Sequence, residues 1–346
     1  MNKVALGVAT ALAAASLSAN ASLNLNLDNE VDGDGDIRGL FTTVPQGDNI
    51  FDESMNRAAH NNTTATQDSS TTSNGSAIQI SLEDSDYSDI NIYQSNQATT
   101  DNSSTYDGEN TVNIDFDSSL STGRNLDNDV TINQKGDRNE IYVLVDNEAP
   151  AYRSTGNRFN IDQDGKFHDT TISVLDGADY NTFNVDLEDT NNNVDITVDG
   201  RSAYGNSVEV TSLNNSDGNE VSIDINDGHM NVVDVDHRGS SDDNQTKVEV
   251  GGDHNDVYVD FDYNSDDNQV LVEVAGNYND TDIDILGGSD YNHVQVTQLG
   301  DSSVADVRLV NGSDYNDMIM VTQTTNDYAN VYGSNADYNS VTVTQN

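Results

Sequence analysis

The side chains best suited to acid–base chemistry or metal binding in this 346-residue chain are six histidines and 61 Asp and Glu residues, and there is no cysteine. The histidines show no His-Glu-x-x-His or similar ligand spacing. They are scattered over predicted turns and strand ends: His60, His168, His229, His237, His254 and His293. No Gly-x-Ser-x-Gly motif occurs, and paired carboxylates are uninformative among so many. We predict no catalytic residues and no enzyme; an enzyme acting on extracellular polysaccharide is the third alternative, after the two set out below.

One segment resembles a calcium loop. Asp28-x-Glu30-x-Asp32-Gly33 places oxygen ligands at alternate positions and a glycine at the sixth, as an EF-hand requires. The twelfth position is Gly39 rather than Glu, and no flanking helices are predicted, so a solvated acidic tail is the better interpretation. We predict no dedicated metal site and no cofactor, and only weak, multi-site Ca²⁺ binding from charge.

The elements that position these side chains follow from composition and pattern. The net charge is 13 − 61 = −48, which argues against nucleic acid or anionic lipid as a partner. The hydrophobic content of 34% is below the roughly 45–50% of ordinary globular domains. A single large globular core is therefore not expected, but the apolar residues are strictly patterned.

The chain divides into three parts. Residues 1–21 read as a signal peptide, with Lys3, an apolar run and the cleavage signature Ala19-Asn20-Ala21. Residues 22–75 lack the repeat and read as a low-complexity acidic and polar segment, with linker or disorder near its end. Residues 76–346 carry the repeat. No later stretch is long enough to span a membrane, so we predict a secreted, extracellular protein.

The repeat is an Asn followed by alternating apolar and polar residues, which is the period of a half-buried strand. Every second copy begins about 24 residues on, and Gly, Asp, Asn and Ser separate the copies. This predicts an all-β fold: a β-solenoid with two short strands per rung of about 24 residues and parallel stacked rungs. Stacked amides would bond along the axis. The predicted ladder residues are Gln94, Asn128, Gln134, Asn139, Asn157, Gln163, Asn181, Asn206, Asn219, Asn231, Asn255, Asn268, Asn279, Asn292, Gln298, Asn316, Gln323, Asn339 and Gln345.

Two further rows are predicted by the same stacking. Stacked carboxylates repel one another, so folding or assembly is expected to depend on salt and pH. These carboxylates are Asp224, Asp234, Asp236, Asp260 and Asp284. Several tyrosines directly precede an anchor Asn, so they are expected to recur on one turn, most simply as packing over the rung edge. These are Tyr180, Tyr278, Tyr291, Tyr315 and Tyr338.

Four segments resemble the repeat of the curlin family, the secreted subunits of the functional amyloid curli. They are Ile90-x-Ile92-x-Gln94, Val130-x-Ile132-x-Gln134-x-Gly136-x-x-Asn139, Val294-x-Val296-x-Gln298-x-Gly300 and Val341-x-Val343-x-Gln345. The resemblance covers about residues 76–346 and the leader. It implies Gln and Asn ladders, and a curli secretion channel and a nucleator or companion curlin as partners. It also implies that the segment 22–75 is a possible secretion tag, the alternative being a plain disordered tail. The chain departs from the family in its longer repeat, its heavier acidic load and its strand-final residues. Many rungs replace the strand-final Gln, with Leu187, Ser212, His237, Phe261 or Ile285.

The sequence therefore predicts a structural subunit of curli-like fibres, a self-polymer that grows by end-to-end stacking of rungs for cell-surface adhesion and biofilm matrix. The final strand has no polar capping helix behind it, which favours strand addition. The alternative is a monomeric, acidic, cation-dependent β-solenoid adhesin or ligand-binding protein, in which Asp repulsion prevents stacking.

Overall fold

The structure is a computed structural model in which part of the chain is described. The described residues are 22–27, 37–43, 49–56, 61–69, 76–83, 88–96, 109–117, 125–126, 128–136, 138–146, 154–165, 167–175, 178–188, 191–213, 218–239, 242–262, 267–287, 291–310, 318–324, 328–334 and 340–345. The predicted leader, the calcium-like loop, Asn316, Asn339, Tyr315 and Tyr338 lie outside them.

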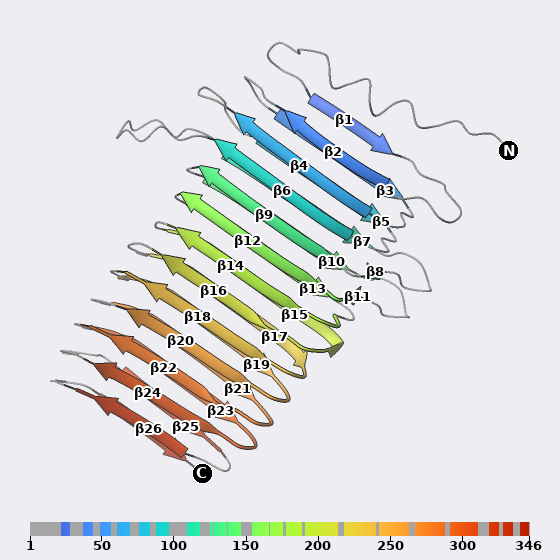
Figure 1. Ribbon diagram of the computed structural model, residues 1–346. Helices are drawn as coiled ribbons and strands as arrows, with labels where there is room; N and C mark the ends of the chain where they lie inside the picture. Colours follow the sequence, from blue (N-terminus) through green and yellow to red (C-terminus); the bar gives the residue numbers. More distant parts are fainter. Residues whose placement is uncertain are drawn as a thin grey trace, which may run out of the picture.

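Two large parallel sheets make up the fold (Figure 1). Sheet A has thirteen strands: β1 (Ser22–Leu27), β3 (Asn49–Asn56), β5 (Ser76–Glu83), β7 (Glu109–Asp117), β10 (Arg138–Asp146), β13 (Asp169–Leu175), β15 (Asn193–Ala203), β17 (Glu220–Gly228), β19 (Gln245–Gly251), β21 (Gln269–Ala275), β23 (His293–Leu299), β25 (Met318–Gln323) and β27 (Val341–Gln345). Sheet B has twelve: β2 (Ile37–Thr43), β4 (Asn61–Ser69), β6 (Ser88–Asn96), β9 (Asp129–Gly136), β12 (Arg158–Gly165), β14 (Thr182–Glu188), β16 (Val208–Leu213), β18 (Val232–Arg238), β20 (Asp256–Asp262), β22 (Thr281–Leu286), β24 (Val304–Val310) and β26 (Tyr328–Gly333).

Successive strands alternate between the two sheets, apart from a short strand pair, β8 (Asn125–Leu126) with β11 (Ser154–Thr155). Each rung is therefore one strand of each sheet. Most rungs after β12 repeat after 24 or 25 positions, as between Asn231 and Asn255 or Asn206 and Asn231, whereas several earlier rungs are longer, with Asp89 paired to Asp129. The predicted β-solenoid with two strands per rung is confirmed. The described residues include no helix long and apolar enough to cross a membrane.

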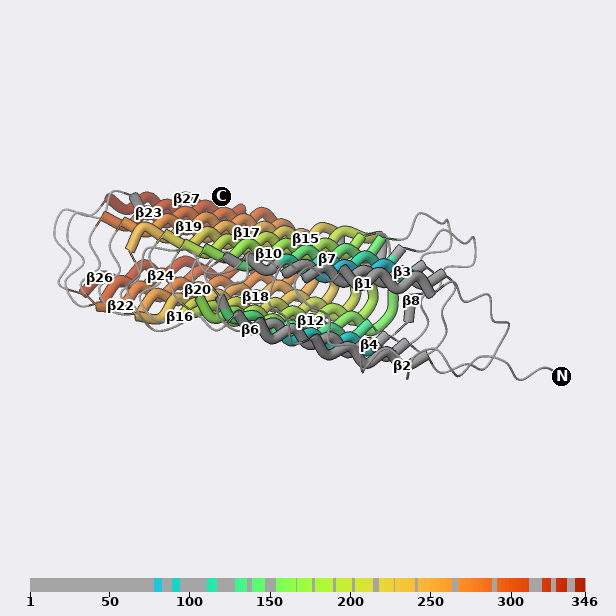
Figure 2. The backbone as a smooth tube through the Cα atoms, turned by 90° about the horizontal axis from the view of Figure 1, so that it is seen from above, coloured from blue at the N-terminus to red at the C-terminus, as the bar shows by residue number. Residues whose placement is uncertain are grey.

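The core lies between the sheets, which form two layers in Figure 2. Strand residues alternate between buried and more exposed, as in β12 and β14. Stacking places like over like: Ile161 pairs with Val185, and the rings of Phe159 and Phe183 stack at 5.3 Å. Each buried Val, Ile or Phe contributes about 1.5–3 kcal/mol. Because only one side chain in two is buried, a third of apolar residues is enough for this core.

The strands extend upstream of residue 76, where the sequence predicted a segment without the repeat. Strands β1 to β4 continue both sheets there, with β3 paired to β5 and β4 to β6. The linker or disorder prediction for this segment differs from what the structure shows. The physical reason is that parallel strands pair through main-chain N–H and C=O groups, which a polar sequence such as that of β4 also supplies.

Candidate functional site

One amide ladder follows the edge where sheet A passes into sheet B, which we call the tight-turn edge. From Ser303 back to Asn181 the side chains bond in one direction. Asn279 Nδ2 donates to Asn255 Oδ1 at 2.9 Å, and Asn255 Nδ2 donates to Asn231 Oδ1 at 2.9 Å. The remaining bonds are Ser303 Oγ to Asn279, Asn231 to Asn206 and Asn206 to Asn181, at 3.4, 3.0 and 3.1 Å. All these side chains are buried, so each bond satisfies an amide that water cannot reach.

The ladder is interrupted between Asn157 and Asn181. Asn128 Nδ2 donates to Asn157 Oδ1 at 3.0 Å, which is the opposite polarity to the later rungs. The Nδ2 atoms of Asn157 and Asn181 are buried and have no hydrogen-bond partner. The rung between Asn128 and Asn157 is also the long one, at 29 residues. An unpaired buried amide costs about 1–3 kcal/mol, so this junction is the weakest point of the ladder.

A second ladder follows the opposite edge, where sheet B passes into sheet A, which we call the loop edge. Here the backbone N–H donates toward the C-terminus: Asn244 N to Asn268 Oδ1 and Asn268 N to Asn292 Oδ1, both at 3.0 Å. The same pattern joins His168 to Asn192, Asn192 to Asn219 and Asn219 to Asn244, at 3.2, 2.7 and 2.8 Å. The two ladders thus run in opposite directions on opposite edges.

The loop-edge ladder depends on a repeated backbone conformation. A residue with positive φ directly precedes almost every anchor, as at Asp243 (58°), Asp267 (56°) and Tyr291 (58°). Left-handed residues of this kind are Asn, Asp or Gly by preference. This turn brings each anchor's N–H to the next anchor's side-chain oxygen.

Glutamines that face the core near the C-terminal ends of some strands form short ladders. Gln163 Nε2 donates to Gln134 Oε1 at 3.1 Å in sheet B, and Gln298 Nε2 donates to Gln323 Oε1 at 3.2 Å in sheet A. Gln94 pairs with Gln134 by register and Gln345 with Gln323. Between Gln163 and the end of sheet B the same column holds the predicted replacements: Leu187, Ser212, His237, Phe261 and Ile285. Two Gln ladders are therefore present among the described residues, one on sheet B at Gln134 and Gln163 and one on sheet A at Gln298 and Gln323.

The sequence treated the anchors as one ladder, whereas the structure separates them onto the two edges. The tight-turn edge holds Asn128, Asn157, Asn181, Asn206, Asn231, Asn255 and Asn279, and the loop edge holds Asn139, Asn219, Asn268 and Asn292. Sequence reasoning left Asn192, Asn244 and Ser303 out of its ladder. Asn192 and Asn244 carried the signal, because each is followed by the alternating strand pattern.

In two rungs a polar pair lies in the core, where a sheet B strand ends and the next sheet A strand begins. Thr170 Oγ1 donates to Gln163 Oε1 at 2.9 Å, and His237 Nε2 lies 2.9 Å from Thr246 Oγ1. The equivalent pair in the rung between β20 and β21 is apolar, Phe261 with Val270. In these two rungs a polar residue at the end of the sheet B strand is matched by a threonine at the start of the next sheet A strand. The match keeps a buried polar group hydrogen-bonded. Ser212, at the end of β16, has Val221 at the equivalent place, and its Oγ has no hydrogen-bond partner.

Both buried histidines are held neutral. His237 is fully buried and stacks on Phe261 with ring centroids 4.7 Å apart, and burial lowers the pKa of its imidazole to about 3. Burial likewise lowers the pKa of His168 to about 4. The other described turn histidines lie at the surface: His229 contacts Tyr204 and Asp253, and His254 stacks on Tyr278 at 4.8 Å. His237 therefore lies apart from His229 and His254, and the described residues contain no group of three or more His, Asp or Glu placed to hold a metal.

The tyrosine row is corrected by the structure. Tyr180 and Tyr278 lie on the tight-turn edge, but Tyr291 lies on the loop edge, because it precedes Asn292 rather than an anchor of the first ladder. The tight-turn edge carries a mixed row in which Tyr180 contacts Tyr204 edge-on at 5.6 Å. The rings pack on one another over the turns, as the packing interpretation predicted.

The predicted carboxylate stack is present on the outer face of sheet B. Asp236, Asp260 and Asp284 are in register on β18, β20 and β22. Burial first, and the charges of Asp284 and Asp236 second, raise the pKa of Asp260 to about 7. Asp234 lies on the same face, but Asp224 lies on sheet A, where burial first and Glu249 second raise its pKa. Asp260 is therefore partly protonated near neutral pH.

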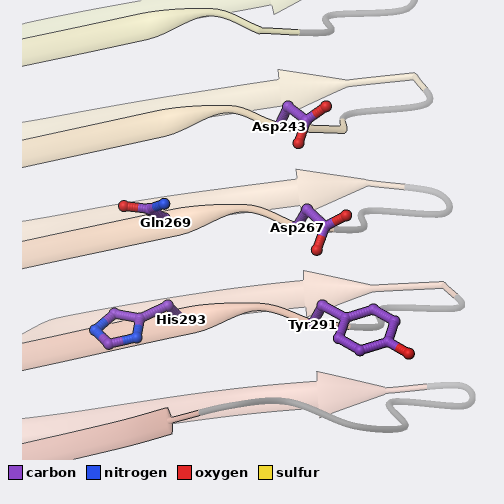
Figure 3. A pocket seen from close by; sticks show the side chains of 5 residues that line it. All are labelled: Asp243, Asp267, Gln269, Tyr291 and His293. Carbon is purple, nitrogen blue, oxygen red and sulfur yellow. The ribbon is translucent and has the colours of Figure 1, made fainter.

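A shallow groove of about 410 Å³ lies on the loop edge (Figure 3). Asp243, Asp267 and Tyr291 line one side, each just before an anchor Asn, and Gln269 and His293 line the other, each just after one. The buried Asn ladder separates the two columns. The groove offers hydrogen-bonding groups and an aromatic ring to a polar ligand.

Comparison of the chain with protein-family models, with curated proteins and with solved structures found no match. The structure shows a parallel β-solenoid with stacked Asn and Gln ladders on rungs of 24 or 25 residues.

Proposed function

We propose that the chain is a secreted structural subunit of a curli-like extracellular fibre, and that it polymerises by end-to-end stacking of rungs. The observation that carries the proposal is the edge formed by β27. Val341 and Val343 pair in register with the buried Ile319 and Val321, yet they are 48% and 43% exposed. Among the described strands β27 pairs only with β25.

An edge of this kind supports strand addition. It presents unpaired N–H and C=O groups together with the inward residues of an open rung. Because all strands of a sheet run parallel, one end of a copy meets the opposite end of the next, and such a head-to-tail contact continues without closing. The amide ladders extend the same way, since Gln345 lies in register with Gln323. The fibre would serve adhesion and matrix formation.

The alternative is a monomeric, acidic, cation-dependent adhesin or ligand-binding protein. It is favoured by the Asp stack on sheet B, where charge repulsion opposes close contact between copies unless a cation neutralises it. In that case the groove of the loop edge is the natural place for a ligand.

Microscopy and fibre diffraction of the purified chain, with and without millimolar Ca²⁺, separate the two. We expect filaments with a meridional reflection at about 4.7–4.8 Å. Filaments only with Ca²⁺ support a fibre whose assembly depends on cations. A β-rich monomer in both conditions contradicts the fibre and favours the adhesin.

A matched pair of variants tests the edge itself. Val343→Asp puts a charge into the open core position and is expected to stop elongation. Thr344→Asp puts the same charge on the neighbouring, outward side of β27, where filaments should still grow. Equal behaviour of the two variants would contradict growth at this edge.

A further inference from the structure

Three successive strands of sheet A carry no charged outward residue. The sequences of β23, β25 and β27 are HVQVTQL, MIMVTQ and VTVTQ, without Asp, Glu, Lys or Arg. Thr297, Thr322 and Thr344 form one column across them by register. Gln295, Met320 and Thr342 form the next. We call the outward side chains of β23, β25 and β27 the neutral face.

On sheet B the strands are acidic as far as β24. Strands β20, β22 and β24 read DVYVDFD, TDIDIL and VADVRLV, and their Asp residues point outward, whereas β26 reads YANVYG and carries no charge. Bringing two such faces together would bury unpaired carboxylates, which costs several kcal/mol for each ion. The neutral face imposes no such penalty. In a chain of net charge −48, this is a surface where a like-charged copy can approach.

The shape of the neutral face also suits sheet packing. Its strands pair in continuous register without a bulge. Threonine, glutamine and methionine side chains give a low surface of uncharged atoms, and Leu299 at its rim is 44% exposed. Sheets with such surfaces stack about 10 Å apart with interdigitated side chains.

We propose that the neutral face is a lateral docking surface for a second copy of this chain, face to face. This contact is perpendicular to the end-to-end contact of the proposed fibre and goes beyond it. Two identical faces meet about a two-fold axis, so β25, the middle strand, meets the same strand of the other copy.

The area indicates how strong the contact is. Three strands about 4.8 Å apart and about 23 Å long cover roughly 330 Å² per copy. This is below a standard interface, so a single pair associates weakly. If the fibre forms, the same contact repeats along it and its effect accumulates, which is the one point where this inference rests on the proposed function.

Single-cysteine variants test the contact, since the chain has no cysteine of its own. Thr322→Cys lies at the centre of the neutral face, and Ser173→Cys is the matched control in the same outward column of sheet A, on β13. Under mild oxidation we expect Thr322→Cys to form disulfide-linked dimers at least tenfold faster than the control. Equal rates would overturn the proposal. End-to-end stacking separates successive Thr322 residues by a whole molecule, so it cannot produce this crosslink.

A charge variant provides a second readout. Thr297→Glu combined with Thr322→Glu brings four carboxylates into each paired contact, because every substitution enters it twice. Filaments of normal length but single width are expected, whereas Ser173→Glu should leave bundles unchanged. Bundles of unchanged width in the double variant would contradict the lateral contact. If the wild-type chain forms no filaments, the end-to-end proposal fails. The crosslinking rates alone then decide whether the lateral contact between neutral faces exists.

Discussion

Sheet A and sheet B share one inward pattern but differ in what they present to solvent. In both, Val, Ile and Phe fill the interior, and an Asn ladder lies at the edge before each strand. Outside, β20 and β22 on sheet B carry stacked Asp, whereas β23 and β25 on sheet A carry Gln, Thr and Met. Inward positions are restricted by packing, so they repeat. Outward positions are free to differ, and the chemistry of each face is set there.

The largest expected effect concerns the core beneath the acidic face. His237 has a pKa of about 3 in the fold against about 6.5 unfolded, so the unfolded state takes up the proton first as the pH falls. Stability from this residue is full above pH 6.5 and is lost toward pH 3, by about 5 kcal/mol at most. His237→Gln reproduces the Gln163–Thr170 corner and should remove much of that loss. Urea unfolding at pH 8 and pH 4 measures the loss of stability in the wild-type chain and in His237→Gln. An identical loss in the two proteins would show that His237 does not cause it.

The next effect concerns the edge that joins the two sheets. A Cβ at Gly228 would lie 2.2 Å from Asn231 Nδ2 and 2.7 Å from Asn206 Oδ1. Gly228→Ala should therefore break that ladder bond and destabilise both sheets by about 3 kcal/mol. At Gly205 the nearest atom is 4.0 Å away, but φ is +80°, so Gly205→Ala should lose only about 1 kcal/mol from backbone strain. Thermal unfolding of Gly228→Ala and Gly205→Ala measures the loss of stability in each variant. Equal losses would show that the structure relieves the clash at Gly228.

The acidic face itself is tested by neutralising its central member. Because the pKa of Asp260 is raised to about 7 from 3.8, its ionised form opposes folding, and stability rises as the pH falls through 7. Asp260→Asn should add about 2 kcal/mol at pH 8, after allowance for solvent screening, and nothing at pH 4. The matched change on sheet A, Glu273→Gln, should alter stability by less than about 0.5 kcal/mol. A gain that did not depend on pH would contradict charge repulsion as its cause.

The smallest effects come from two arginines on the outer face of sheet B. Arg308 Nη1 lies 2.8 Å from Asp284 Oδ2, and the carboxylate is largely buried. Arg308→Gln should destabilise by about 1 kcal/mol at low salt. Arg158 lies 3.9 Å from Asp129 with both side chains well exposed, so Arg158→Gln should change stability by about 0.3 kcal/mol or less. Melting curves in 20 mM and 500 mM NaCl check both, since salt should weaken the exposed Arg158 pair more completely than the partly buried Arg308 pair.

Much of the fold was predictable because a solenoid repeats a local pattern. The alternation of apolar and polar residues fixed the strands, and the 24-residue period fixed two strands per rung. Three features were not predictable. Strands β2 and β4 lie in a segment whose apolar pattern is weak, and their pairing comes from main-chain groups. The division of the Asn anchors between the two edges depends on which sheet each strand joins. The placement of Tyr291 and Tyr278 on different edges depends on the same feature.

The candidate surfaces were predictable only in part. The stack of Asp236, Asp260 and Asp284 followed from the spacing, but the sequence did not place Asp224 on the other sheet. His237 lies inside the core, where its Nε2 pairs with Thr246 and its Nδ1 is buried without a hydrogen-bond partner. That pair joins residues of different sheets, so neither strand pattern alone reveals it.

By itself the sequence determined that the chain forms stacked β-rungs with buried amide ladders, because spacing and side-chain alternation act along the chain. Only the tertiary structure decided which residues share a face. One sheet receives every second strand, so residues about 24 positions apart meet while sequence neighbours are separated. The acidic face of sheet B and the neutral face of sheet A are products of that sorting.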